Sequence, residues 1–590
     1  MRGSRVGRGR AAAFGATPSN ADDRRTSRKN WGVLAAVVAA LLAAPTAYAQ
    51  SSVQPGVIER EYEEARPPRP STEITIPSVD APRAWEDAQA VRFVLNRVEI
   101  DGNVAIGDQE LMQPFVPLIG REVSIAEVFS AAEGITHIYD GAGYALSLAY
   151  VPAQEVRDGV VVVRVVEGFI AEVAIRDSQD TRSGRWDDFA ERLKESRPLR
   201  SEVLERTLLL ANDLAGVKVK SVFERIPNAA PGAMRLVMSI DRKAVGVHAE
   251  VNNRGSSAIG PIREFLNIDL NGLLGNEERI TVFGVGALDG MELAYFGGRL
   301  DFPVSSEGTV VSLEASRSET DPGTPALSAV DFKGEGWTAS FGVSHAFIRS
   351  LRENLYGSMG VVYKDLKSRL LGTNASKDRI RAVAVGLDYD SRDRWGGLWR
   401  AVATLFIGVD AFDATKEGDP LASRAGASGK FARIEGAVSH LVSISPYASF
   451  YAEIAGQVAD GPLLVSEQCG YGGGHIGRAF DPFEITGDHC VKGRAEFRFD
   501  IPVRSDGMRS VIDGVQFYAL ADFGVMIKAG TLLPLEERVE SAESIGLGVR
   551  VRASEYLSGF AEVVRPIGRG VALENGSKEA RFFFGISADY

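Results

Sequence analysis

The sequence contains few of the residues that metal centres, disulfide scaffolds and helical membrane spans require. Two of its 590 residues are cysteine and six are histidine, and no two histidines form an H-x-x-x-H pair. These counts exclude a disulfide scaffold and a four-cysteine zinc site. Beyond residue 45, no apolar run approaches the ~18 residues that a spanning helix needs. The chain is therefore not a polytopic helical membrane protein, whereas a β-barrel is compatible with its sequence.

Motifs of catalysis are also missing. The sequence has no Walker A motif and no Ser/His/Asp or Cys/His constellation, so we expect no catalytic site, no cofactor and no metal ion. Gly472–Gly477 fits the pattern G-x-G-x-x-G, but Asp481-Pro482 follows and no helical pattern opens there. Because a dinucleotide site needs a helix at that point, we interpret these glycines as a tightly folded loop. The formal charge of −12 disfavours a nucleic-acid partner.

The composition is that of a folded chain with several domains. Hydrophobic residues make up 45% and charged residues 24% of the sequence, which is ordinary for globular proteins. A length of 590 residues exceeds what one core needs. The 63 glycines are more than the roughly 7% average predicts, and they indicate many tight turns or closely packed strands.

Residues 1–49 have the pattern of a signal peptide. A basic segment precedes the short apolar run Trp31–Ala44, and the small-residue pattern Ala47-Tyr48-Ala49 follows. A membrane anchor helix is the alternative, but the apolar run is too short for it. We expect the mature chain to begin at Gln50, beyond the inner membrane of a Gram-negative bacterium. Residues 50–92 then form a Pro-rich linker in which Val57–Arg66 is a candidate short plug helix.

Residues 93–168 read as a compact α+β module. Phe93–Gly102 is a candidate strand, and Ser124 with Glu127 fits a capping box at the start of a helix. Apolar residues recur at helical spacing until Gly141. Two strands are predicted to follow, at Leu146–Val156 and Gly159–Val166.

Residues 169–243 repeat the same β-α-α-β-β order, which indicates a tandem module. The expected elements are strand Ile170–Asp177, helix Trp186–Glu195, a helix capped by Ser201, and strands Val217–Arg225 and Met234–Arg242.

In residues 244–590, apolar residues no longer recur at helical spacing. Apolar and polar residues alternate instead. Ile545, Leu547, Val549 and Val551 share one parity, for example, which gives a strand one polar and one apolar face. An even number of ~10-residue strands of this kind matches a 16-stranded antiparallel transmembrane β-barrel. A soluble β-sandwich or propeller is the alternative. The expected strands begin near Val245, Glu264, Arg279, Met291, Thr309, Gly336, Asn354, Arg379, Gly397, Gly429, Tyr447, Gly493, Val515, Glu543, Leu557 and Glu579.

Two small modules before a barrel resemble the outer-membrane transporters of two-partner secretion, the TpsB class or haemolysin activator/secretion family. Tyr139–Gln154 with Arg164–Gly168 resembles a first POTRA domain, and Leu208–Asn212 lies in a stretch that resembles a second. Asn253–Ser256 resembles the entry to the first barrel strand. Leu520–Gly524 resembles the family motif F-x-D-x-G, with leucine in place of the aromatic residue. A long loop resembles the family motif V-R-G-Y through Ile476, Gly477, Arg478, Ala479 and Phe480.

The resemblance implies a contact inside the barrel between Arg478 and Asp522. Strand parity agrees, because Asp522 and Glu496 lie on the polar faces of their strands and a carboxylate facing lipid is costly. Gly477 and Gly524 leave room for a close approach. The alternative is an Arg478 exposed near the surface, where a pair is worth little.

The resemblance also implies a function. We expect POTRA domains in the periplasm to capture an unfolded, TpsA-like β-helical exoprotein of haemolysin or adhesin type, and the barrel to export it through the outer membrane. Leu146–Val156 and Val217–Arg225 are candidate edge strands for this capture. Outer-membrane lipid and the barrel assembly machinery are the other expected partners. An outer-membrane protein assembly factor and a porin or receptor are the alternative functions.

Cys469 and Cys490 are the only cysteines, and they flank the loop that carries Arg478. An oxidising compartment allows them to form a disulfide. Two free thiols are the alternative.

Overall fold

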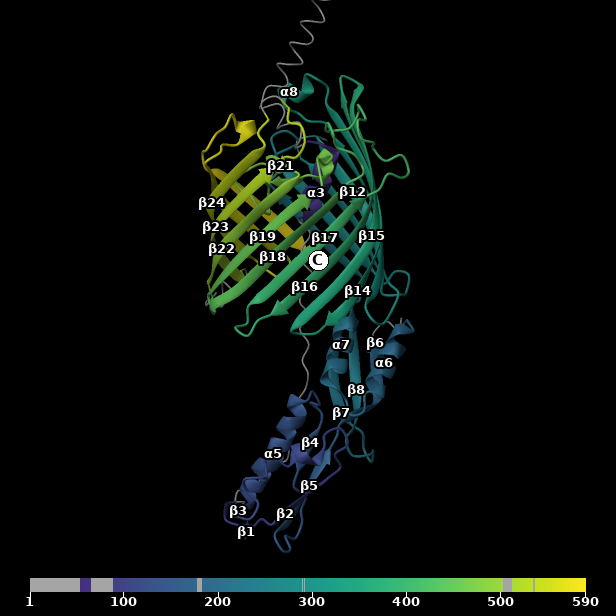
Figure 1. Cartoon of the computed structure of the whole chain (residues 1–590), viewed down its shortest axis with the longest axis vertical. Helices are drawn as coiled ribbons and strands as arrows, with labels where there is room; N and C mark the ends of the chain where they lie inside the picture. The colour runs from purple at the N-terminus through teal and green to yellow at the C-terminus, as the bar shows by residue number, and fades with distance from the viewer. Residues whose placement is uncertain are drawn as a thin grey trace, which may run out of the picture.

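The computed structural model describes the chain as two small modules attached to a large barrel (Figure 1). The expected signal peptide and most of the expected linker lie outside the described residues. Within the described part of the chain, no helix is long and apolar enough to cross a membrane. The described residues are 53–64, 89–177, 183–288, 290, 292–501, 512–533 and 536–590.

The first module packs α5 against a three-stranded sheet of order β2-β5-β4, in which β2 and β5 are parallel. The capping box at Ser124 is confirmed, because its hydroxyl accepts from the Glu127 backbone and Glu127 accepts in return. The elements are β1 (Arg92–Val94), β2 (Arg97–Asp101), α4 (Asp108–Leu111), β3 (Glu122–Ser124), α5 (Ile125–Gly141), β4 (Leu148–Tyr150) and β5 (Val160–Val166).

Two of the expected strand bounds in this module are wrong. The predicted strand Phe93–Gly102 is split, because Leu95 turns into the core and its N–H donates to the Arg121 carbonyl. β1 therefore pairs with β3 instead of continuing into β2. β4 is also shorter than expected and ends before Pro152, whose ring nitrogen has no proton to donate to a ladder.

The second module has the sheet order β6-β8-β7, so β7 lies at an edge as β4 does in the first. The expected N-cap role of Ser201 is wrong. Ser201 is the first residue of α7 and Arg200 takes the cap position, while the Ser201 hydroxyl accepts from the Ala145 N–H of the first module. The elements are β6 (Phe169–Asp177), α6 (Arg185–Glu195), α7 (Ser201–Asn212), β7 (Val217–Arg225) and β8 (Ala233–Arg242).

The two modules share part of one core. Leu146 of the first module is buried among residues of the second, including Trp186 and Leu204. Backbone hydrogen bonds cross the same junction, from Leu199 to the Gly168 carbonyl and from Ser201 to the Gly143 carbonyl. The modules therefore form one continuous arm below the barrel.

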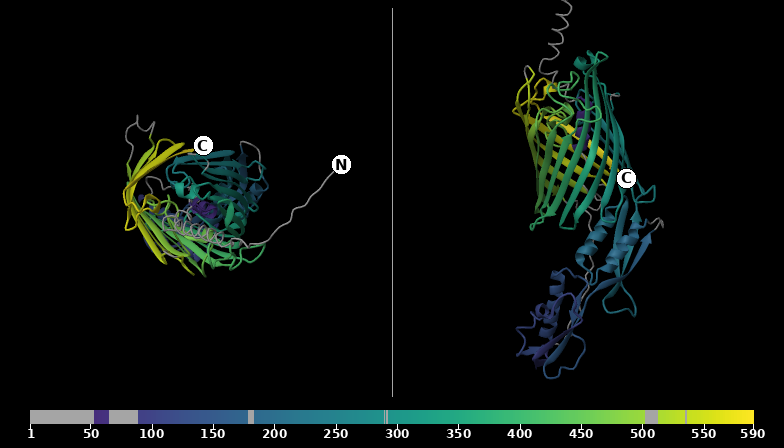
Figure 2. Two further views of the ribbon diagram at one scale, coloured as in Figure 1. Left: turned by 90° about the horizontal axis from the view of Figure 1, so that it is seen from above. Right: turned by 45° about the vertical axis from the view of Figure 1, so that its right-hand side comes forward.

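In the described residues, sixteen antiparallel strands close into the expected barrel (Figure 2). The first and last strands, β9 and β26, join over only five residue pairs. The barrel strands are β9 (Val245–Asn252), β10 (Arg263–Asn271), β11 (Arg279–Ala287), β12 (Leu293–Pro303), β13 (Thr309–Thr320), β14 (Lys333–Arg349), β15 (Glu353–Leu370), β16 (Thr373–Arg392), β17 (Leu398–Gly408), β18 (Ala432–Ser445), β19 (Ala448–Ala459), β22 (His489–Ile501), β23 (Gly514–Ile527), β24 (Val539–Arg552), β25 (Leu557–Ile567) and β26 (Arg581–Asp589). Two short helices, α8 (Pro325–Ser328) and η3 (Ala572–Glu574), lie in loops.

The expected strand length of about ten residues is too short for part of the barrel. β14, β15 and β16 have 17, 18 and 20 residues. Their hairpins continue as paired sheet at the end away from the modules, where the ion pair between Glu335 and Arg369 joins β14 to β15.

The expected parity of β23 is confirmed. Phe517 and Phe523 are exposed on the outside, where lipid surrounds a barrel, and Asp522 is buried. Tyr518 and Leu520 share the parity of Asp522 and are buried as well. The inner face of β23 is therefore mixed, and it presents one carboxylate to the lumen.

Candidate functional site

A long segment between β19 and β22 folds into the barrel lumen, and we call residues 460–488 the lumen loop. It contains η2 (Val465–Glu467) and the small hairpin of β20 (Cys469–Tyr471) with β21 (Ile485–Gly487). Ile476, Ala479 and Phe480 of the predicted motif are buried in one apolar cluster with wall residues such as Leu520. These side chains fix the loop against the inner face of the barrel.

Arg478 is the centre of the loop's polar contacts. Its Nη2 lies 2.6 Å from Oδ1 of Asp522, and its Nε lies 3.0 Å from Oδ2. Its Nη1 also donates to Glu496. Both carboxylates are fully buried, so Arg478 lies in the lumen against Asp522, and the alternative of an exposed Arg478 near the surface is wrong. A bidentate, charge-assisted pair of this kind fixes orientation as well as distance.

The two carboxylates differ in how much they depend on the loop. Glu496 also pairs with Arg498 at 2.8 Å and Arg550 at 3.0 Å, both on the barrel wall. Asp522 accepts its other hydrogen bonds from the loop backbone at Gly477 and Arg478, and from Ser544 at 3.3 Å. Displacement of the loop would therefore leave Asp522 almost without partners.

Gly477 makes the tight turn of the motif possible. Its φ is +95°, and a Cβ atom there would lie 2.6 Å from the Gly472 backbone nitrogen. No other residue type fits this position without a shift of the turn. The G-x-G-x-x-G pattern therefore serves the fold of the loop, as the sequence indicated.

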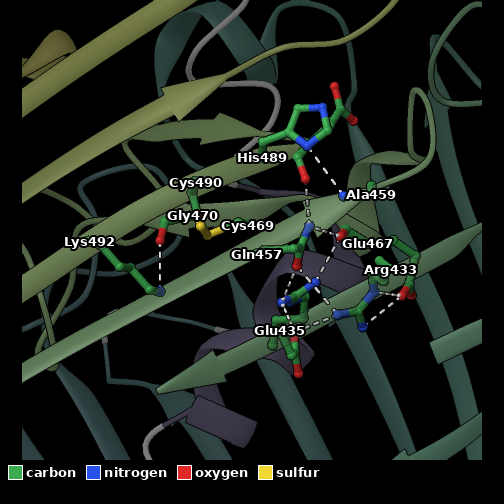
Figure 3. The surroundings of a disulfide bond; sticks show 12 residues. Arg433, Glu435, Gln457, Ala459, Glu467, Cys469, Gly470, His489, Cys490 and Lys492 are labelled. Carbon is green, nitrogen blue, oxygen red and sulfur yellow. Dashed lines mark hydrogen bonds and ion pairs between the residues drawn. A yellow bond between two sulfur atoms is a disulfide. The ribbon is translucent and has the colours of Figure 1, made fainter. Parts of the chain in front are cut away.

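The base of the loop is covalently joined to the barrel wall. Cys469 and Cys490 form a disulfide between β20 and β22 (Figure 3). Beside it, the Nζ atom of Lys492 donates to the Gly470 carbonyl oxygen at 2.9 Å. The loop is thus held at its base by a covalent bond and at its tip by Arg478.

Three arginines that the sequence analysis did not single out hold the rest of the loop. Arg581 pairs with Asp481 at 2.7 Å, and Arg424 pairs with Asp488 at 2.5 Å. Arg433 pairs with Glu467 at 2.9 Å. Arg433 and Arg581 lie on strands and Arg424 lies in the loop between β17 and β18. A single arginine in either setting carries no distinguishing signal, so these contacts were not predictable.

Arg254 connects the first barrel strand to the lumen loop. Its Nη1 donates to the Arg478 carbonyl oxygen at 3.4 Å, and its other terminal nitrogen pairs with Glu562. Its guanidinium group lies over the rings of Phe560 and Phe583. The expected place of Asn253–Ser256 at the entry to the first strand is wrong, because this segment follows the end of β9, and from there it contacts the loop directly.

The helix α3 (Pro55–Glu64) lies inside the barrel, as Figures 1 and 2 show, and we call it the plug helix. It begins two residues before the expected bound, and residues 65 and 66 of the expected helix lie outside the described residues. Val57 packs with Val465 and Phe483 of the lumen loop. Arg60 donates to the Glu467 carbonyl oxygen at 2.9 Å. The plug helix and the lumen loop thus obstruct the lumen together.

Below these two elements, a cavity of about 1630 Å³ opens toward the second module. Its lining joins Asn212 and Lys218 of that module to Glu61 of the plug helix and Arg478 of the loop. Contacts with the barrel, one part-buried pair and one buried hydrogen bond among them, hold the second module at the cavity's rim. Arg349 pairs bidentately with Asp213 at 2.7 and 2.8 Å, and Trp186 donates to Glu277.

Among the described residues, no group of three or more His, Cys, Asp or Glu side chains is arranged to hold a metal ion. The site is instead a network of buried ion pairs that holds the plug helix and the lumen loop in a polar lumen. Such a network can keep a channel closed. The channel can reopen if other charged groups replace those of the plug helix and the lumen loop.

Comparison with known proteins places these features in a wider group. A model of the POTRA domain, ShlB-type, matches residues 93–168. A model described as haemolysin secretion/activation protein ShlB/FhaC/HecB matches residues 236–547, more than half of the chain.

Individual relatives match over almost the whole chain. The heme/hemopexin transporter protein HuxB of Haemophilus influenzae is 21% identical over 535 residues, which cover 88% of this chain and 92% of that protein. The structure of CdiB from Escherichia coli has a TM-score of 0.67 at 17% identity, covering 92% of this chain and 98% of that one. CdiB from Acinetobacter baumannii has a TM-score of 0.59 at 13% identity, covering 92% and 99%. The structural likenesses show a shared fold.

Proposed function

The chain belongs to the haemolysin secretion/activation protein family (ShlB/FhaC/HecB), and from this premise we propose that it exports one unfolded partner protein from the periplasm to the cell surface. The barrel lies in the outer membrane, and the POTRA modules extend into the periplasm. The observation that carries the proposal is the obstructed lumen, because a permanently open porin has no need of a plug helix and a locked loop above a periplasmic cavity.

Capture begins at the exposed sheet edges of the arm. β4 and β7 are edge strands, and an extended client segment can add to such an edge through backbone hydrogen bonds with little demand on sequence. β7 offers nine residues for this pairing, and β4 only three. We therefore assign the main capture edge to β7, which lies next to the cavity lining at Val217 and Lys218.

Export then requires the lumen to clear. The plug helix leaves its place and the client enters from the cavity beneath it, while folding of the client outside supplies direction. The proposed client is a large, β-helical secreted protein of haemolysin or adhesin type. Insertion of the barrel itself depends on outer-membrane lipid and the barrel assembly machinery.

Deletion of the gene tests this proposal against its alternatives. We expect loss of one large secreted protein from the medium, with unchanged amounts of other outer-membrane barrels. A general fall in outer-membrane barrels would instead show an assembly factor. Normal secretion together with a lost single-channel conductance would show a porin. Re-expression of the intact chain is the control for each readout.

A further inference from the structure

Three consecutive charged residues of the plug helix, Glu59, Arg60 and Glu61, each meet an opposite charge in the lumen. Glu59 lies 3.8 Å from the ammonium group of Lys364 on β15 and accepts a hydrogen bond from Thr338 on β14. The side chain of Glu59 is buried. An acidic residue at this position is therefore matched by a cation and a hydroxyl of the wall.

Arg60 has the opposite charge to Glu59, and the groups around it are hydrogen-bond acceptors. It pairs with Glu435 on β18 at 2.9 Å and donates to Gln457 on β19 at 3.3 Å. It also reaches the carbonyl oxygen of Glu467, whose carboxylate pairs with Arg433 (Figure 3). A basic residue at position 60 thus fits a site built from three acceptor groups.

Glu61 completes the series with Arg263 at the start of β10, at 3.1 Å. Arg263 is 1% exposed, and Tyr62 of the same helix also contacts its guanidinium group. Two further nitrogens of Arg263, Nε and Nη2, are buried without a hydrogen-bond partner in the described residues. The carboxylate that compensates this buried cation therefore comes from the plug helix.

When the plug helix leaves, the lumen wall presents the cation Lys364, the acceptors around Glu435 and the cation Arg263. A buried charge that loses its partner is strongly destabilised, and this applies most to Arg263, because Lys364 keeps Glu467 at 3.5 Å and Glu435 keeps Arg433. Water entering the lumen relieves part of this cost, and a new segment with the same charge order relieves it more fully. The vacated surface is thus specific for one order of charges.

We propose that this surface is a binding site for client segments in which an acidic, a basic and an acidic residue follow one another, and that the plug helix is its resident mimic. The inference rests on the proposed export function and names the segment chemistry that displaces the plug. A client segment of this kind takes the place of Glu59–Glu61 and keeps the plug helix displaced, so that the rest of the client chain can follow once that segment moves on.

Block of the channel by peptides tests the site directly. The full-length protein carrying Glu59→Ala, Arg60→Ala and Glu61→Ala is placed in a planar bilayer, where the loosened plug is expected to give a steady open current. A peptide with the sequence of residues 53–64 is added on the POTRA side. The matched control peptide carries Glu59→Arg, Arg60→Glu and Glu61→Arg, so its length and apolar residues are unchanged.

We expect the native-order peptide to block at a concentration ~10-fold or more below that of the inverted peptide, because like charges in a buried contact cost several kcal/mol. The difference should shrink at about 1 M salt, where screening acts within ~3 Å. Equal block by the two peptides, or no block at about 1 mM native peptide, overturns the inference.

Wall variants provide a second measurement on independent strands. In the Arg263→Glu protein, a peptide carrying Glu61→Arg should block better than the native peptide. In the Lys364→Glu protein, a peptide carrying Glu59→Arg should do so. Unchanged preference in both backgrounds overturns the inference. If the peptides are distinguished but gene deletion leaves secretion unchanged, the proposed export function is wrong and the binding site stands. Failure of the export function and failure of the binding site are therefore distinguishable.

Discussion

The ring of Tyr471 in the lumen loop lies directly against Gly524 on β23. A Cβ atom at position 524 would stand 2.3 Å from Cδ2 of that ring. Gly524 is two residues from Asp522, so the ring and the ion pair at Arg478 lie side by side on the same strand face. The absence of a side chain at Gly524 is what allows the loop to approach the wall.

Gly524→Ala is therefore expected to push the loop off the wall and reduce export. Overpacking of this kind costs about 1–3 kcal/mol, and the cost falls on the docked loop. Gly284→Ala on β11 is the matched control, because the nearest atom to its Cβ would be 4.0 Å away. Secreted client and heat-modifiable barrel are measured together. Equal secretion from both variants would show that the ring contact has no role.

Arg478→Ala and Asp522→Ala should each impair secretion more than barrel assembly. Removing one partner of a buried pair costs about 3–5 kcal/mol, whereas removing both is milder. The double variant is thus expected to secrete at least as much client as Arg478→Ala. Arg369→Ala is the control, since its pair with Glu335 is half-exposed and worth about 0–1 kcal/mol. Full secretion from both single variants at normal barrel levels would remove the pair from the mechanism.

The barrel was predictable because lipid imposes a strict parity on each strand. Ile545 and Leu547 alternate with residues that face the lumen, and β24 lies where that alternation indicated. The start of β16 was misplaced by six residues, from Thr373 to Arg379. Its first residues, such as Asn374 and Ser376, are polar, so the apolar signal that marks a lipid-facing strand is missing there.

The lumen was predictable only where a family motif marked it. Arg478 and Asp522 were found by resemblance and parity together. The partners of the plug helix were not, because Lys364, Glu435 and Arg263 come from three separate strands. Their convergence is a property of the closed barrel, and no spacing in the sequence records it.

At the junction between the second POTRA module and the barrel, the effects of substituting Asp213 and Arg349 on stability should be coupled. Asp213 and Arg349 make a bidentate pair, so Asp213→Ala, Arg349→Ala and the double variant form a mutant cycle. We expect a coupling energy of about 1–3 kcal/mol for this pair. Hydrogen exchange at α7 in detergent-solubilised protein is the measurement. Strictly additive effects would mean that the pair does not hold the module.

The disulfide should confine the lumen loop without being needed for the fold of the barrel. It closes a loop with a sequence separation of 21 residues, and the chain-entropy model assigns about 3 kcal/mol to a closure of that size. The sixteen-strand ladder does not include the bond, so Cys469→Ser with Cys490→Ser is expected to leave heat-modifiable barrel unchanged. Arg478 then holds the loop tip without a fixed base, and protease cleavage within residues 470–488 should rise. Thiol labelling of the denatured, unreduced wild type checks the premise, since two reactive thiols would show that the bond does not form in cells. If the bond forms and the double-serine variant is cleaved no faster than wild type, then Arg478, Arg581 and Arg424 hold the loop unaided.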